Sequence, residues 1–497
     1  WFNRDVADLS GATTGVAEAA GWDAHQGAGG LNGVTPQMVA VYHSVIAEMA
    51  GYAPAFFAVA GDLINGRWFT VEFLDMFDPV SPNRVEAIGK AGAIYYGWYQ
   101  WLFSDISPLL GALGDHEIGD DDWPPGSEKS LRVADMKAAF GSGMVDALSL
   151  PAINGAPARP SGTPFEDSSY AYRHDNLLLV SVDVFRQQSP TTQIHAIHGS
   201  VSPDISGDHL AWLAALLAAA DSDPSIDHVV VQGHVPVLRP VRMQNTSGMM
   251  LVGREDSAFW QLLRQHDQRR GGKVRLYLCG EVHAVTASRD PDGDIVQLAH
   301  GNPPITQGAT PYTGLGNYLV FAVEPGRITA ELRRFELDAD GSSYYWQPSD
   351  VKTPAITSAS SSTSAGALVI DTGGEQAAIT ASGDLALVDQ RGLTLHFDFD
   401  HTTPSGNFSN EGSIGNDFYE GVARGGAAAV AGYFGNAIGL DGSGDYVESG
   451  RGNITEGESR SVSAWLQVAC ETRKDVRRCL LAPSRRDARF TVSPSAV

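Results

Sequence analysis

Four apolar segments of the chain are each followed at once by a glycine and polar side chains. The four sites read AGD at 60–62, LGDHE at 113–117, QGH at 232–234 and CGEVH at 279–283. Glycine lets the backbone turn sharply where a strand ends, so the next side chain is presented outward. In an open α/β sheet, ligands bind outside the carboxyl ends of the strands. The pattern therefore predicts that Asp, Glu and His side chains gather at one edge of a sheet.

Helical and strand-like patterns alternate over the first 340 or so residues. Apolar residues have helical spacing over 35–51, 208–220 and 257–267. Strand-like apolar segments occur at 54–60, 170–183, 228–234, 274–283 and 316–337. In the last of these, EPGR at 324–327 predicts a turn between two strands. Such alternation indicates an α/β layered domain.

The charge of the chain limits its partners. The formal net charge is −24 over 497 residues, which disfavours nucleic acid and anionic membranes as ligands. No run of about 20 apolar residues occurs, so we expect no membrane span. Three cysteines are too few for a disulfide framework, and Cys279, within an apolar run, is expected to be a buried thiol.

The polar residues after the four segments suit a metal centre. Candidate ligands are Asp62, Asp115, His234, Glu281 and His283. Carboxylate oxygens and imidazole nitrogens are ligands for Zn²⁺, Mn²⁺, Fe or Mg²⁺, and this many donors fit two ions better than one. Taken singly, each residue could also have a purely structural role, as a turn cap or as a buried histidine whose hydrogen bonds are satisfied. The metal interpretation depends on the four sites acting together.

The order and spacing of AGD, LGDHE, QGH and CGEVH resemble the calcineurin-like metallophosphoesterase superfamily, which includes purple acid phosphatases. The resemblance covers roughly residues 1–340 and implies a four-layer α/β/β/α sandwich. It implies that Asp62 bridges both ions and that His283 binds the first. Asp115, His234 and Glu281 would bind the second ion, and His116 would be the catalytic histidine.

Two candidate ligands depart from the family pattern. Asp115 stands where the family has Asn, and Glu281 stands where it usually has His. Both changes keep an oxygen donor and add negative charge, which shifts the second site toward Mn²⁺, Mg²⁺ or Fe and away from Zn²⁺. The first family motif, D-x-H, has no clean match. We expect its strand, Asp and His to precede residue 1; Asp23 with His25, or a one-metal site, are the alternatives.

The resemblance implies hydrolysis of phosphomonoesters or phosphodiesters through a metal-bound hydroxide, with a small phosphate ester as substrate. Asn65 and His300 are candidate substrate-binding residues. The long segments 63–110 and 119–205 would shape the pocket, and Asp120, Asp121 and Asp122 are expected to form a solvated rim.

The composition changes near residue 346. We expect a metallophosphoesterase domain over 1–345, a Ser/Thr/Ala-rich linker over 346–392 and a β-only region over 393–469. In that region LTLHFDFDHT, GNAIGLDGSGDYVE and SVSAWLQV resemble part of a laminin-G-like or concanavalin-type jelly roll. Residues 470–497 are anomalously basic, which favours an altered end that truncates the sandwich over a basic interaction tail.

The jelly-roll resemblance implies attachment to a glycan or a surface, with Ca²⁺ as a candidate ion. It also implies a secreted or cell-surface bacterial protein, although residues 1–497 contain no visible signal peptide. A second function class remains open at this point. A degenerate phosphoesterase fold could serve only as a glycan- or surface-binding protein.

Overall fold

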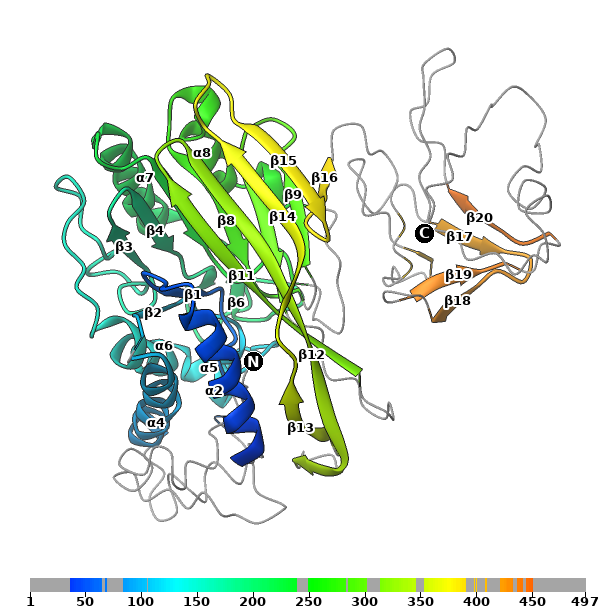
Figure 1. Cartoon of the computed structure of the whole chain (residues 1–497). Helices are drawn as coiled ribbons and strands as arrows, with labels where there is room; N and C mark the ends of the chain where they lie inside the picture. The colour runs from blue at the N-terminus through cyan, green and yellow to red at the C-terminus, as the bar shows by residue number, and fades with distance from the viewer. Residues whose placement is uncertain are drawn as a thin grey trace. The chain divides into compact units, whose positions relative to one another are not determined.

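The chain divides into two compact units, Trp1–Gly392 and Leu393–Val497 (Figure 1). The computed structural model describes residues 36–64, 68, 84–104, 106–238, 249–282, 285–301, 313–345, 353–389, 397, 399, 407–408, 421–431, 436–440 and 444–449.

A mixed seven-stranded sheet forms the centre of the first unit, with the strand order β16-β9-β10-β8-β7-β4-β3. Its strands are β3 (Tyr170–His174), β4 (Leu177–Ser181), β7 (His228–Gln232), β8 (Val274–Cys279), β9 (Val285–Arg289), β10 (Val296–His300) and β16 (Leu387–Asp389). Strands β4, β7, β8 and β10 run parallel to one another. Every residue of β4 and β7 is buried. Their sequences are rich in Leu and Val without alternation, as expected for parallel strands that are covered on both faces.

Two short strands beside this sheet lead to the polar motifs AGD and LGDHE. Strand β1 (Phe57–Val59) pairs in parallel with β2 (Leu109–Gly111), and α4 (Arg84–Ser104) lies between them in the chain. A further antiparallel pair joins β5 (Phe185–Gln187) to β6 (Val201–Pro203). Both β1 and β2 therefore point their carboxyl ends in the same direction.

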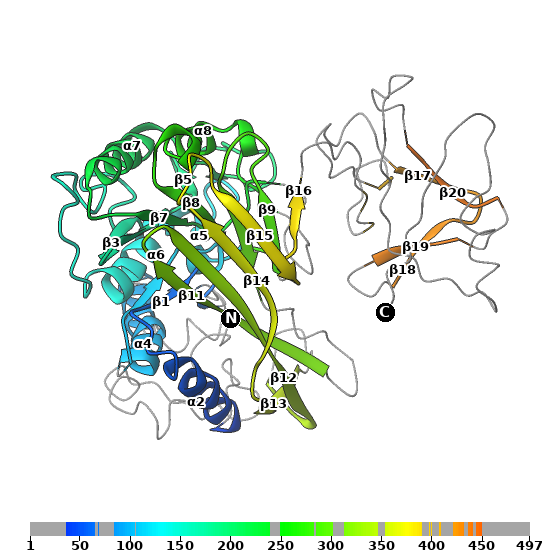
Figure 2. The same ribbon diagram turned by 45° about the horizontal axis from the view of Figure 1, so that its top comes forward.

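Five α-helices besides α4 and four short helical turns are described. The helices are α2 (Pro36–Ala50), α5 (Glu128–Leu131), α6 (Val133–Phe140), α7 (Gly207–Ser222) and α8 (Ala258–Gln265), and the short turns cover His116–Ile118, Gly141–Val145, Arg254–Asp256 and Gln268–Arg270. Figure 2 shows α7 and α8 side by side. Helix α8 begins where the Ser257 side chain accepts a hydrogen bond from the Trp260 backbone N–H. The helices expected over 35–51, 208–220 and 257–267 are thus confirmed. None of the helices in the described ranges is long and apolar enough for a bilayer span.

A second, antiparallel sheet follows in the chain. It contains β11 (Thr313–Glu324), β12 (Arg327–Tyr345), β13 (Thr353–Ala359), β14 (Thr363–Asp371) and β15 (Ala378–Gly383). The turn expected at EPGR joins β11 to β12, and Gly326 adopts φ +79° there. This backbone conformation favours glycine.

The expectation of a linker over 346–392 is wrong for residues 353–389, which form β13 to β16. Strand β14 pairs with β12 and β15, and β16 pairs with β9 of the large sheet. Thr, Val and Ile occur among the small residues of this segment and favour strands. Leu368 and Ile370 of β14 are buried in the main core, so packing against a neighbouring layer determines the strand.

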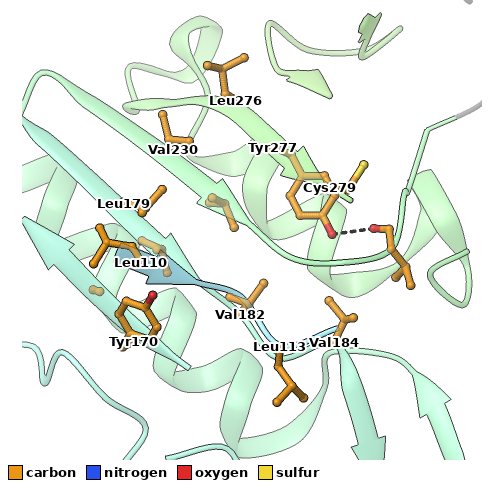
Figure 3. Close-up of a cluster of buried hydrophobic side chains, with 14 of the residues drawn as sticks. Leu110, Leu113, Tyr170, Leu179, Val182, Val184, Val230, Leu276, Tyr277 and Cys279 are labelled. Atoms are coloured by element: carbon orange, nitrogen blue, oxygen red, sulfur yellow. Dashed lines mark hydrogen bonds between the residues drawn. The ribbon is translucent and has the colours of Figure 1, made fainter. Parts of the chain in front are cut away.

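The main hydrophobic core of the first unit contains residues of both sheets and of most of the helices. It includes Val230 of β7, Leu276 of β8 and Leu332 of β12. Figure 3 shows part of it, with Tyr170 and Tyr277 among the aliphatic side chains. Their hydroxyls donate hydrogen bonds to the carbonyls of Gly111 and Val235, so both buried polar groups are satisfied. Cys279 is a buried free thiol, as expected.

The second unit is described as two antiparallel strand pairs. Strand β17 (Gly421–Arg424) pairs with β20 (Tyr446–Ser449), and β18 (Ala428–Ala431) pairs with β19 (Asn436–Gly439). The jelly roll expected over 393–469 stays a prediction. The basic tail 470–497 lies outside the described residues.

Acidification is expected to destabilise the first unit through His209 of α7. The ring lies between Phe165 and Trp212, and its Nε2 is 3.0 Å from Ser169 Oγ. Burial and the nearby Lys137 lower the pKa of His209 from 6.5 to about 4, although Asp183 opposes the shift. Between pH 6.5 and pH 4 the unfolded chain therefore binds a proton that the folded chain excludes. The free energy of unfolding should fall over this range by about 3 kcal/mol from this residue.

The contribution of His209 can be measured by urea unfolding at pH 7 and pH 4.5. We expect His209→Phe, which keeps an aromatic ring in the stack, to lose less stability on acidification than the parent chain. Carboxylates that titrate in this range contribute equally to both proteins, so the difference isolates His209. An equal loss in both proteins would contradict the prediction.

Candidate metal centre

Four polar side chains meet from four loops, each at the carboxyl end of a parallel strand. Asp62 follows β1, Asp115 follows β2, His234 follows β7 and Glu281 follows β8. Because β1 is parallel to β2 and β7 is parallel to β8, each pair of loops leaves its strands in the same direction. All four side chains are buried. The convergence predicted from the glycine-polar motifs is therefore present for these residues.

The His234 ring is the centre of this group. Its Nδ1 lies 2.7 Å from the carbonyl oxygen of Ala60, which can only accept a hydrogen bond, so Nδ1 carries a proton. Its Nε2 lies 3.1 Å from Asp115 Oδ1, 3.3 Å from Asp62 Oδ1 and 3.3 Å from Glu281 Oε2. The Nδ1 hydrogen bond fixes the ring so that Nε2 faces the three carboxylates. A histidine held in this way by a carbonyl is the usual arrangement of a metal ligand.

Glycines allow the loops to approach one another this closely. A Cβ on Gly61 would lie 2.3 Å from His234 Nδ1, and a Cβ on Gly280 would lie 2.5 Å from the Ala60 carbonyl oxygen. The backbone N–H groups of Gly280 and Glu281 both donate to the His234 carbonyl, at 2.9 and 3.0 Å. The glycine before each polar residue is thus required by the packing of the loops.

The buried charges shift the proton affinities of the group strongly. Burial opposes a charge on His234, but Asp62, Asp115 and Glu281 outweigh burial and raise its pKa well above 6.5. Burial raises the pKa of Asp62 to about 7, assisted by the neighbouring Asp115 and opposed by His234. For Asp115, burial is outweighed by His116 and His234, and its pKa is lowered. Three carboxylates face one imidazole, and a bound cation would offset this excess of negative charge.

Two buried atoms support a cation site at this point. When the His234 ring is neutral, with its proton on Nδ1, its buried Nε2 presents a lone pair to Asp115 Oδ1 at 3.1 Å, and neither atom then has a hydrogen-bond partner among the described residues. Asp62, Asp115 and His234 each offer a ligand atom, and these atoms lie within 4.8 Å of one another. Buried polar atoms without partners cost free energy unless something binds them. Carboxylate oxygens with one imidazole nitrogen are a donor set that fits a divalent cation.

A second group lies beside the first and includes the expected catalytic histidine. Asp115, His116 and Asp120 also offer atoms within 4.8 Å of one another. His116 is partly exposed, with its Nε2 4.0 Å from Asp62 Oδ2 and 3.9 Å from Asp120 Oδ1. Asp120 is half-exposed, in line with a solvated rim. Its approach to His116 had no signal in the sequence beyond the spacing of four residues.

Of the remaining predicted site residues, His300 alone is among the residues that the structure describes. His283, Asn65, Asp23 and His25 lie outside the described residues. His300 ends β10 and hydrogen bonds with Asn317, and burial lowers its pKa to about 4. Its assignment to substrate binding stays a prediction.

Glu117, the last residue of LGDHE, has a place in the site that the sequence pattern did not assign. Its side chain is fully buried and accepts hydrogen bonds from four backbone N–H groups in the loops that carry Asp62 and Asp115. Its signal in the sequence was its place as the last residue of the LGDHE motif, to which no role was assigned. An acid there could equally have been a solvated side chain.

Several solved structures are similar to the chain, and one of them covers most of its length. No protein-family model matches the chain, and no curated protein matches it. The solved structure is described as "Structure of PhoD"; it is 13% identical, and the match covers 71% of this chain and 71% of that one with a TM-score of 0.41. A likeness at this TM-score carries no argument about the site, whose description rests on its own geometry.

Proposed function

We propose that the chain is a metal-dependent phosphoesterase whose dinuclear centre hydrolyses phosphomonoesters or phosphodiesters. The observation that carries the proposal is the contact of His234 Nε2 with three carboxylates from three other loops, at 3.1 to 3.3 Å. The order of the four motifs in the chain, with its resemblance to the metallophosphoesterases, supports the reaction class. A four-layer α/β/β/α sandwich is part of the same proposal.

Each residue of the group has a role in this proposal. Asp115, His234 and Glu281 would hold one ion, and His283 would contribute to the other. Asp62 would be shared, because its Oδ1 faces His234 Nε2 at 3.3 Å and its Oδ2 faces His116 Nε2 at 4.0 Å. A carboxylate whose two oxygens face different groups is suited to bridge two ions.

Bound ions of this kind polarise a phosphoryl group and make water a better nucleophile near neutral pH. The chain itself would supply His116, which is partly exposed beside Asp62. From there its imidazole can donate a hydrogen bond to a phosphoryl oxygen or to the leaving oxygen. Fixed donors aimed at charge that develops in the transition state are the largest contribution a side chain can make.

The surroundings of His116 favour a small ester over a polyanion as substrate. Asp120 is half-exposed beside it, and the whole chain carries a formal net charge of −24. Like charges repel an incoming polyphosphate or nucleic acid more strongly than a single phosphate ester. We therefore propose a small phosphate ester as the substrate class.

Removal and return of metal tests the function. The full chain, freed of metal with a chelator, is expected to hydrolyse neither p-nitrophenyl phosphate nor its bis ester. Addition of Mn²⁺, Zn²⁺ or Fe should restore hydrolysis, and the negative charge of the group predicts that Mn²⁺ or Fe restores more than Zn²⁺.

A matched pair of histidine variants completes the test. His116→Ala should lower kcat by about 10²-fold or more, whereas His174→Ala, at the exposed end of β3, should leave kcat unchanged. Failure of every metal to support hydrolysis by the parent chain would overturn the proposed function.

A further inference from the structure

Glu117 turns its carboxylate toward the backbone of the metal-site loops. Its Oε2 accepts from the N–H groups of Asp62 at 2.9 Å and Gly114 at 2.7 Å. Its Oε1 accepts from Leu63 at 2.7 Å and Ile64 at 3.2 Å. Both oxygens are therefore used, and all four donors are main-chain groups.

These donors come from two loops that the strand ladder does not join. The β1–β2 pairing ends at Val59 and Gly111, followed by one hydrogen bond from Ala112 N to Val59 O at 2.7 Å. Beyond that point the chain continues to Asp62 on one side and to Gly114 and Asp115 on the other. Glu117 continues the connection where the backbone ladder stops.

The conformation of Asp62 shows why this connection matters. Asp62 has φ +58° directly after Gly61 at φ +97°, a left-handed backbone that an aspartate seldom adopts. Three consecutive N–H groups, from Asp62 to Ile64, point at the Glu117 carboxylate. Successive N–H groups that converge in this way form a concavity for an anion. Glu117 is the anion, and its hydrogen bonds stabilise the turn that aims Asp62 at His234.

Gly114 leaves room for this arrangement. A Cβ at this position would lie 2.3 Å from Asp62 Oδ1 and 2.7 Å from Glu117 Oε2. The two carboxylates thus pack against the same glycine from the two sides of the junction. The placement of Asp62 relative to Asp115 is set at this junction.

We propose that Glu117 is the positioning residue of the metal centre, where its carboxylate fixes the Asp62 turn and the Asp62–Asp115 spacing and thereby sets the metal affinity. The proposal rests on the proposed function only in that the cluster binds metal. Groups that orient metal ligands from behind typically change metal affinity by about 10- to 100-fold when they are replaced.

Metal binding by variants of the full chain tests this role. Glu117→Gln keeps the size of the side chain but turns an NH₂ group toward backbone donors. We expect its affinity for Mn²⁺, measured by titration calorimetry on metal-free protein, to fall by about 10- to 100-fold. Glu117→Asp, which keeps the carboxylate, should recover part of the loss.

Two controls separate positioning from general destabilisation. Tyr170→Phe removes a buried hydrogen bond to the carbonyl of Gly111, next to the site but outside both loops, and should leave Mn²⁺ affinity within about twofold of the parent. Glu128→Gln changes an exposed glutamate on α5 and should behave as the parent.

The outcomes distinguish this inference from the proposed function. Failure of the parent chain to bind Mn²⁺ would contradict the metal centre and the positioning role together. Binding by the parent with unchanged affinity in folded Glu117→Gln would contradict the positioning role alone. Should Glu117→Gln not fold, Glu117→Asp decides: an affinity equal to that of the parent counts against the role, and a reduced affinity with an unchanged circular dichroism spectrum supports it.

Discussion

His234→Ala is expected to reduce kcat/KM for p-nitrophenyl phosphate by about 10³-fold or more, because metal ions contribute several kcal/mol of transition-state stabilisation. The ring is the only imidazole that contacts Asp62, Asp115 and Glu281 together within the described ranges. Its loss would remove the proposed nitrogen ligand and also the hydrogen bond from the residue after β7 to the Ala60 carbonyl at 2.7 Å. Activity and bound metal should therefore fall together.

The measurement combines steady-state kinetics with metal analysis of the purified protein. His228→Asn is a matched control, since His228 begins the same strand and bonds the Glu324 carbonyl at 2.9 Å, at the end of β7 away from His234. We expect this control to fold and to retain the metal content and kcat/KM of the parent. Retention of activity by His234→Ala would contradict the assignment of the site. A variant that keeps its metal but loses activity would contradict the ligand role.

Asp294→Ala is expected to lower the free energy of unfolding of the first unit by about 3–5 kcal/mol, as the loss of one partner of a buried ion pair does. Asp294 is buried in the turn between β9 and β10. Its Oδ1 accepts from Arg269 Nε at 2.9 Å and Arg289 Nη2 at 2.8 Å, and its Oδ2 accepts from Ala377 N at 2.9 Å. The substitution leaves two guanidinium groups and a buried N–H without this acceptor. Because Ala377 precedes β15, the contact also joins the second sheet to the first.

Asp292→Asn is the matched control for this prediction. Asp292 lies in the same turn, but its side chain is 73% exposed, with Arg264 as an ion-pair partner at 3.5 Å. Exposed pairs contribute about 0–1 kcal/mol, so this variant should remain close to the parent. Urea unfolding of the full chain, followed by tryptophan fluorescence, gives both values. Equal stability of the two variants would show that the Asp294 contacts do not stabilise the fold.

The sequence was sufficient for features that depend on neighbouring residues. The helix over 208–220 and the strand over 228–234 follow from apolar periodicity, which a few adjacent residues determine. The polar residues Asp62 and His234 could be placed at strand ends for the same reason, since an apolar run followed by glycine marks where a strand stops. The hairpin at EPGR could be predicted as well, because the four residues of a turn largely determine its conformation.

Composition alone was ambiguous for residues 353–389. Ser, Thr and Ala suit a flexible linker, but they also suit a strand when a neighbouring layer covers one face. Leu368 and Ile370 pack into the main core, and β14 pairs with β12. Burial and pairing with distant residues determined the outcome, and a local pattern does not contain that information.

By itself, then, the sequence determined which residues end the strands and which chemistry their side chains offer. Only the tertiary structure decided that Asp62, Asp115 and Glu281 meet at one nitrogen of His234, that the Ala60 carbonyl selects that nitrogen, and that Glu117 faces the backbone. These contacts join residues far apart in the chain, such as Asp62 and Glu117, which are 55 positions apart. Their distances follow from how the sheets and loops pack, and no short stretch of the chain specifies that packing.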